Sequence, residues 1–134
     1  MTPTQLSSVT ALMVDDEAYF RKFIGRILMN EGIGSVIEAR DGTEAIDLFR
    51  VAKPELVVLD INMPRQNGLE TLRGLRTLSP DVPIVMLTSV ADEAIVERCV
   101  EEGADAFIRK DVPADELVRE LHAVLTDPTL EPAA

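Results

Sequence analysis

The sequence predicts an α/β fold, a single domain built on a parallel sheet of five strands with helices on both faces. Five short apolar segments alternate along the chain with five segments in which apolar residues recur at helical spacing. The connections are short, as in folds that place a helix between successive parallel strands. Two of the apolar segments, residues 56–59 and 84–87, contain no polar residue, which is typical of strands buried on both faces.

The first half of the chain supplies two strands, residues 9–14 and 35–39, and two helices. The first helix ends at Gly32, a residue suited to a helix C-cap. Asp41-Gly42 predicts a turn, and the second helix ends before Pro54, because the residue preceding a proline disfavours the helical region. The apolar residues of the two helices are Phe20, Phe23, Ile24, Ile27 and Leu28, and then Ala45, Ile46, Leu48, Phe49 and Ala52.

The second half supplies three strands, residues 56–59, 84–87 and 106–108, each followed by a predicted helix. Ser79-Pro80 ends the third helix, Gly103 closes the fourth, and Pro113 suits the first turn of the last one. The apolar residues of these helices are Leu69, Leu72, Leu75 and Leu78; Ala91, Ala94, Ile95, Cys99 and Val100; and Leu117, Val118, Leu121 and Leu125.

The two ends of the chain are polar or rich in proline. Residues 1–8 predict a flexible lead and residues 127–134 a flexible tail, which leaves residues 9–126 as the folded domain.

Composition excludes several classes of protein. The chain has 134 residues, a formal net charge of −11 and a sequence pI near 4.4, which argues against a nucleic-acid-binding surface. No apolar run approaches the length of a membrane span, and the first ten residues lack the features of a signal peptide. A single cysteine, Cys99, fits a reducing compartment. We expect an acidic, soluble, cytoplasmic protein that binds neither membrane nor nucleic acid.

Charged and polar residues follow four of the predicted strands. Asp15-Asp16, Asp60, Thr88 and Lys110 come at the carboxyl ends of the first, third, fourth and fifth strands. Because these ends lie at one edge of a parallel sheet, we expect the residues to meet in one crevice. Three carboxylates repel each other there by roughly 4 kcal/mol per pair at about 4 Å, so the site needs a cation, and oxygen ligands suit Mg²⁺.

The four segments resemble the receiver domain of bacterial two-component response regulators. They are Val14-Asp15-Asp16-Glu17, Leu59-Asp60-Ile61-Asn62-Met63-Pro64 with Gly68, Leu87-Thr88-Ser89 and Phe107-Ile108-Arg109-Lys110. The resemblance covers residues 9–125 and implies a flavodoxin-like sheet with strand order 2-1-3-4-5. It also implies that Asp60 accepts a phosphoryl group from the phosphohistidine of a sensor histidine kinase.

The resemblance implies a role for each residue of the crevice. Asp16, Asp60 and the main-chain carbonyl of Asn62 bind Mg²⁺ or Mn²⁺, and Asp15 helps through water. Lys110 pairs with one phosphoryl oxygen and Thr88 donates a hydrogen bond to another. Movement of Thr88 is coupled to Phe107, and the surface formed by the fourth helix, fifth strand and fifth helix then changes its preference for a protein partner. Such a protein is a phosphoacceptor switch that loses its phosphate slowly, and not an enzyme in the ordinary sense.

Two further expectations come from the resemblance. Phe20 and Phe23 flank the site and are predicted to be partly exposed for docking of the kinase. Many receivers have proline directly after the lysine, in a cis peptide, whereas Asp111 follows Lys110 here, so we expect a trans bond.

Several alternatives remain at this point. A Mg²⁺-dependent phosphohydrolase would carry an Asp-x-Asp pair at one strand end, a pattern that Asp60-Ile61-Asn62 does not match. A carrier of flavin mononucleotide would have a Ser/Thr-rich loop after the first strand, where this chain has Asp15-Asp16-Glu17. The chain could be a receiver excised from a DNA-binding regulator, although the short tail favours a stand-alone protein. A stand-alone receiver either binds a downstream target or passes phosphate to a histidine phosphotransfer protein. We expect a monomer, with a dimer on phosphorylation as the alternative.

Overall fold

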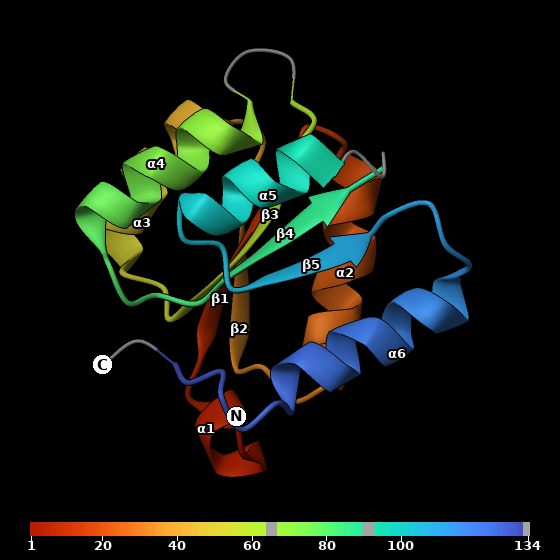
Figure 1. Ribbon diagram of the computed structural model, residues 1–134. Helices are drawn as coiled ribbons and strands as arrows, with labels where there is room; N and C mark the ends of the chain where they lie inside the picture. The colour runs from red at the N-terminus through yellow and green to blue at the C-terminus, as the bar shows by residue number, and fades with distance from the viewer. Residues whose placement is uncertain (64–66, 90–92, 133–134) are drawn as a thin grey trace.

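The fold is an α/β sandwich around a five-stranded parallel sheet, as predicted (Figure 1). The computed structural model describes residues 1–63, 67–89 and 93–132. The strands are β1 (Thr10–Val14), β2 (Ser35–Ala39), β3 (Leu56–Asp60), β4 (Ile84–Thr88) and β5 (Ala106–Arg109). Their order, β2-β1-β3-β4-β5, is the predicted one, and every pair is parallel. Two residues used in the predictions, Pro64 and Ala91, lie outside the described residues.

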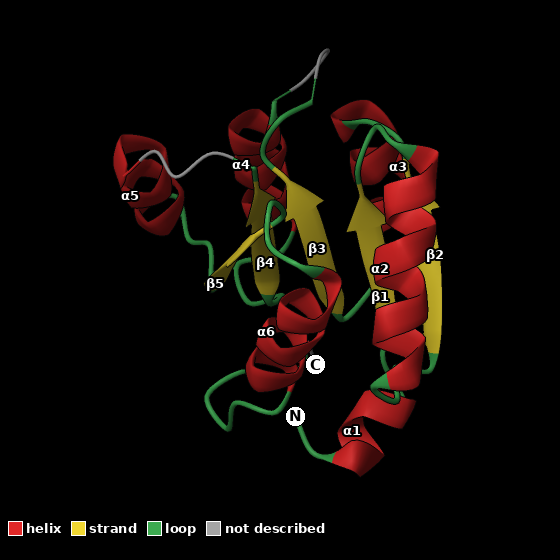
Figure 2. Ribbon diagram, turned by 90° about the vertical axis from the view of Figure 1, so that its right-hand side faces the viewer, coloured by secondary structure: helices red, strands yellow, loops and turns green. Residues whose placement is uncertain are grey.

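Five helices cover the sheet, two on one face and three on the other (Figures 1 and 2). α2 (Ala18–Asn30) and α6 (Ala114–Leu125) lie on one face, and α3 (Gly42–Ala52), α4 (Gly68–Leu78) and α5 (Glu93–Glu101) on the other. This is the doubly wound arrangement that short right-handed crossovers between parallel strands produce. None of the helices described is long and apolar enough to span a bilayer.

The pleat of the central strands divides their side chains between two cores. In β3, Val58 faces α2 and α6 while Val57 and Leu59 face the other three helices. All five residues of β3 and all five of β4 are buried, as expected for strands covered on both faces. The core is mostly aliphatic, with Phe20 and Phe49 among its buried residues, and it holds the strand ends in place.

The amino end of the chain differs from the predicted loose lead. Residues Pro3–Ser7 form a short helix, α1, which begins with a capping box in which Thr2 and Gln5 exchange side-chain hydrogen bonds. The side chains of Met1 and Leu6 are buried, and the Met1 ammonium group donates to the Leu125 carbonyl oxygen at 2.9 Å. Because the segment is mostly polar, its sequence did not indicate the capping box or the burial of Met1 and Leu6.

The predicted tail is also packed in part, because the Leu130 side chain is 8% exposed and the Leu130 carbonyl accepts a hydrogen bond from the Met1 ammonium group.

In the helices, some residues that were predicted to face inward are in fact exposed. Val118 is 37% exposed while Leu117, Leu121 and Leu125 are buried, and in α5 Ile95 and Val100 are exposed while Cys99 is buried. A single helix contacts the sheet along a narrower stripe than its full set of apolar residues covers.

Candidate functional site

The structure brings together the residues predicted at the strand ends. Asp15 follows β1, Asp60 is the last residue of β3, Thr88 is the last residue of β4, and Lys110 follows β5. The parallel sheet places all four at its carboxyl edge, where α/β folds build their binding sites. The predicted crevice is therefore present.

Three carboxylates meet at this edge. One oxygen from each of Asp15, Asp16 and Asp60 lies within 4.8 Å of the other two. Asp15 and Asp60 are 0% and 1% exposed, whereas Asp16 is exposed. Burying two like charges so close together is unfavourable unless a cation compensates them. Oxygen donors with one open side fit a hard divalent cation such as Mg²⁺.

The ammonium group of Lys110 supplies part of that compensation. Lys110 Nζ lies 2.8 Å from Asp15 Oδ2 and 3.3 Å from Asp60 Oδ2, and it is 3.9 Å from Glu17 Oε1. It also lies 4.3 Å from the centroid of the Phe20 ring, a cation–π contact. The peptide bond that follows Lys110 is trans, as predicted.

The electrostatics of the site shift two pKa values. Burial, and then the charge of Asp15, raise the pKa of Asp60 to about 6. Burial alone would lower the pKa of Lys110, but its hydrogen bond to Asp15 and the charge of Asp60 outweigh burial, so its pKa lies above its ordinary value. Lys110 is therefore a permanent cation beside a carboxylate that is held in an unfavourable charged state at neutral pH.

The loop after β3 is shaped around Asp60. The Asn62 N–H donates to Asp60 Oδ1 at 3.1 Å, and the Asn62 side-chain amide donates to Ser89 Oγ at 3.0 Å, which links this loop to the end of β4. Gly68, the first residue of α4, packs against the loop so closely that a Cβ there would lie 2.5 Å from Ile61 Cα. A glycine is required for that approach, which explains its place in the motif.

Thr88 and Phe107 share a cavity of about 290 Å³ between α5 and β5. Thr88 is 4% exposed at the end of β4, and Phe107 is partly buried on the neighbouring strand. The two residues predicted to be coupled therefore line one space.

The predicted docking aromatics differ in exposure. Phe20 is 7% exposed and packs against Phe23 and Tyr19, whereas Phe23 is partly exposed and Tyr19 is 72% exposed. Partial exposure of Phe20 is thus wrong, because its ring covers Lys110 instead. A groove of about 600 Å³ beside Phe23 and Val112 runs between α2 and α6. A docking role for this face stays a prediction.

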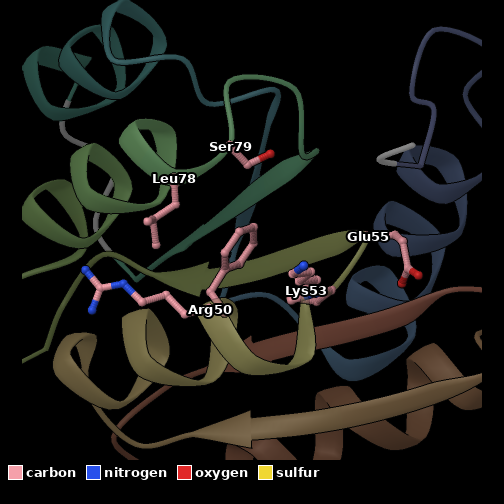
Figure 3. Close-up of a pocket in the computed structure, with 7 residues that line it drawn as sticks. Arg50, Lys53, Glu55, Leu78 and Ser79 are labelled. Atoms are coloured by element: carbon pink, nitrogen blue, oxygen red, sulfur yellow. The ribbon is translucent and has the colours of Figure 1, made fainter.

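A separate cavity of about 420 Å³ lies near the amino end of β3, at the opposite end of the strand from Asp60 (Figure 3). Lys53 at the end of α3 and Leu78 and Ser79 at the end of α4 line it, together with Glu55 just before β3. Lys53 adopts a left-handed conformation with φ of 48°, and Glu55 accepts a hydrogen bond from the Thr10 N–H at 2.7 Å. None of the predicted site residues lines this cavity.

Sequence reasoning assigned no role to Glu17 and Ser89, which contact the site. Glu17 approaches Lys110, and its place in the run Asp15-Asp16-Glu17 was the available signal. Ser89 accepts a hydrogen bond from Asn62; the predicted strand order made the two loops neighbours but did not identify this contact.

Known proteins resemble this chain over most of its length. Residues 11–122 match the family model of the response regulator receiver domain. Response regulator MprA of Mycobacterium bovis (strain BCG / Pasteur 1173P2) is 39% identical over 129 residues, 95% of this chain and 55% of that protein. Response regulator MprA of Mycobacterium sp. (strain KMS) is 40% identical over 119 residues, 87% of this chain and 50% of that protein. The chain thus spans about half the length of these relatives.

Solved structures agree. Chemotaxis protein CheY4 of Vibrio cholerae has a TM-score of 0.77 at 28% identity, with 87% of this chain and 98% of that one covered. NtrX from Brucella abortus has a TM-score of 0.77 at 30% identity, with 87% of this chain and 26% of that one covered. With a match over most of its length and the predicted acidic crevice in place, the chain belongs to the response regulator receiver domain family of two-component signalling.

Proposed function

We propose that Asp60 accepts a phosphoryl group from the phosphohistidine of a sensor histidine kinase and that this changes which protein the chain binds. The observation that carries the proposal is the position of Asp60: a carboxylate 1% exposed at the sheet edge, beside Lys110 and two further carboxylates. Structural carboxylates are rarely buried in such a group, because each one raises the cost of ionising the next.

A divalent cation fits this crevice. Asp15, Asp16 and Asp60, with the main-chain carbonyl of Asn62, would hold Mg²⁺ or Mn²⁺ through oxygen atoms alone. When bound, the cation offsets the negative charge of the carboxylates and of an incoming phosphoryl group. Lys110 adds a positive charge 3.3 Å from Asp60 Oδ2, and its raised pKa keeps it protonated.

The transfer itself is a simple exchange of bonds. An Asp60 carboxylate oxygen attacks phosphorus, a P–O bond forms, and the P–N bond to the donor imidazole breaks, so that its electron pair stays on the imidazole nitrogen. The protein contributes positioning and electrostatic stabilisation, as in phosphoryl transfer generally. The chain is modified once per cycle, so it acts as a phosphoacceptor switch with slow loss of its own phosphate.

The switch would use Thr88, Lys110 and Phe107. Inverting a two-state equilibrium from 1:99 to 99:1 takes about 5.5 kcal/mol, and hydrogen bonds to charged groups contribute about 1.5–3 kcal/mol each. Thr88 and Lys110 together could thus supply most of the bias. Phe107 shares a cavity with Thr88, which gives its ring space to move when Thr88 moves. The α5–β5–α6 surface would then present a changed face to its partner.

A second candidate is that this receiver works as one part of a longer regulator. It is favoured by the coverage of the relatives, of which the chain spans about half. A third use, as a relay that passes phosphate to a histidine phosphotransfer protein, needs the same chemistry at Asp60. Phosphotransfer profiling separates relay from output, because a relay gives its phosphate onward faster than it hydrolyses it.

Beryllofluoride with Mg²⁺, an analogue of the phosphoryl group, tests the proposal. The chain has no tryptophan, so amide NMR spectra are the suitable readout. We expect shifts at Thr88, Lys110 and Phe107 in the wild-type protein and none in Asp60→Ala. The proposal fails if the wild type does not respond, or if the response survives in Asp60→Ala.

A further inference from the structure

We propose that the groove between α2 and β2 binds an extended, acidic segment of a partner protein, which adds as a strand to the free edge of β2. The groove has a volume of about 540 Å³. It is lined by Arg21, Lys22, Gly25, Arg26, Met29 and Asn30 from α2 and its end, and by Gly34, Ser35, Val36 and Glu38 from β2 and its start. Neither Asp60 nor Lys110 belongs to it, so the inference goes beyond phosphorylation.

The first observation is that β2 is an edge strand. In the described sheet β2 pairs with β1 and has no second neighbour. Ser35 donates its N–H to the Val9 carbonyl at 3.2 Å, and the Ala39 carbonyl accepts from the Asp15 N–H at 3.1 Å, so both residues direct their backbone groups toward β1. Because residues alternate in a parallel ladder, Val36 and Glu38 direct theirs outward. The backbone N–H and C=O groups of these two residues could pair with a partner strand.

The second observation is the charge of the groove. α2 carries Arg21, Lys22 and Arg26 and no carboxylate, in a chain whose net charge is −11. Glu38, the single acid among the lining residues, is occupied: it lies 3.0 Å from Arg21 Nε and 2.6 Å from Lys22 Nζ. Arg26 makes no ion pair within the described part of the chain. Three cations against one carboxylate leave a positive groove, which complements an acidic segment.

Lys22 and Arg26 also stand one helical turn apart on α2. Like charges at that spacing destabilise a helix by a few tenths of a kcal/mol, and no acid on α2 relieves them. Both cations are exposed, whereas Arg21 is held by Glu38 and by the Asp15 carbonyl oxygen at 2.7 Å. Lys22 shares the carboxylate of Glu38, so Arg26 is the cation of the groove with no ion pair among the described residues, and it is the one available to a partner's carboxylate.

The third observation is the shape of the groove. At Gly25, which lines the groove, a Cβ would lie 3.7 Å from Val36 Cγ1, an ordinary contact distance, so a methyl group fits here and only a larger side chain would extend into the groove. Met29 is 49% exposed and offers an apolar contact at the end of the groove. A segment that alternates acidic and apolar residues would match this lining. An oligonucleotide has the charge but lacks the peptide backbone that extends a sheet.

Fluorescence anisotropy with a short labelled peptide of alternating glutamate and valine provides the test, on the unphosphorylated chain. We expect Arg26→Glu and Gly25→Leu each to raise the Kd at least about tenfold, the first by reversing charge and the second by filling the groove. Gly25→Leu increases helix propensity, and its response to beryllofluoride should stay at the wild-type level, which separates this inference from the function of Asp60.

Two probe controls complete the experiment. A peptide N-methylated on alternate residues loses the donors of one edge and should bind at least about tenfold more weakly if a strand is added. In amide NMR, the wild-type peptide should shift Val36 and Glu38. The inference is overturned if the N-methylated peptide or a serine–valine peptide binds equally well. It is also overturned if the shifts fall on α5 and β5, if a single-stranded oligonucleotide of equal charge binds more tightly, or if the peptide does not bind.

Discussion

At the scale of single residues, Asp60 is held in a costly state. Its side chain is buried beside Asp15, and the fold places one ammonium group, that of Lys110, against both carboxylates. The same burial that makes Asp60 difficult to ionise makes it receptive to any cation that enters the crevice. A residue kept this way serves binding or chemistry at the expense of stability.

The raised pKa of Asp60 has a defined consequence for stability. The pKa is about 6 in the folded chain and about 3.9 in an unfolded one, so between about pH 4 and pH 6 the folded state binds more protons. Stability without Mg²⁺ therefore falls as pH rises through this range, by up to about 3 kcal/mol. Asp60→Asn cannot ionise, so in EDTA near neutral pH it should be more stable than the wild type by about 1–3 kcal/mol.

Urea denaturation followed by circular dichroism at several pH values checks this prediction. The difference between Asp60→Asn and the wild type should shrink toward zero near about pH 3, below the pKa of the carboxyl in both the folded and the unfolded state. Asp81→Asn, on an exposed aspartate, is the matched control and should show no such trend. If Asp60→Asn were less stable than the wild type at neutral pH in EDTA, the claim that the ionised Asp60 carboxylate destabilises the fold would be contradicted.

At the scale of elements, the site could be predicted because its residues stand at the ends of strands. The strand ends converged because a parallel sheet leaves no other place for them, and this holds whatever the details of packing. Helical periodicity placed Phe20 in the apolar stripe of its helix, but it could not identify the neighbour of the ring, Lys110, and the wrong expectation of partial exposure came from the resemblance. The helix α1 was missed because its capping box lies in a segment too short for periodicity to register.

The start of α3 offers a test at this scale. Asp41, predicted as a turn residue, is the N-cap, and its carboxylate accepts a hydrogen bond from the Glu44 N–H at 2.8 Å. Asp41→Ala should lower the free energy of unfolding by about 1 kcal/mol. Asp47→Ala removes a carboxylate from the same helix, where it makes a loose 3.8 Å pair with Arg50, and should cost less than about 0.5 kcal/mol. Equal losses in thermal or urea denaturation would argue against the cap.

At the scale of the whole molecule, the fold serves to hold one acidic edge together. Side chains from residues 15 to 110 meet there because four strands end at the same level. The sequence was sufficient to predict the sheet, its faces and the meeting of Asp15, Asp60 and Lys110 at one edge, but it gave no role to Glu17 or Ser89. The sequence was insufficient to predict the groove along β2. Its ability to bind a strand depends on which backbone groups of β2 face outward, and its positive charge depends on α2, which carries no acid.

Cation binding should stabilise the entire fold. A ligand that binds the folded state adds about 2.7 kcal/mol at a free concentration of about 100 times its Kd. We therefore expect Mg²⁺ to raise the melting temperature over that in EDTA, with a larger effect at pH 8 than at pH 5 because Asp60 must lose its proton. Asp16→Asn, on an exposed carboxylate, should not lower the stability in EDTA, because it removes one of three mutually repelling charges, and it should weaken the Mg²⁺ effect. A Mg²⁺ effect unchanged in Asp16→Asn would remove this residue from the site.

The central claim is that Asp60 is the phosphoacceptor, and intact-protein mass spectrometry tests it most directly. Phosphoramidate has the P–N bond of phosphohistidine, so it serves as donor without a kinase. With Mg²⁺ we predict the added mass of one phosphoryl group in the wild type and in Asp81→Asn, and no addition in Asp60→Asn or in EDTA. Phosphoryl uptake by Asp60→Asn equal to that of the wild type, or no uptake by the wild type, would contradict the claim.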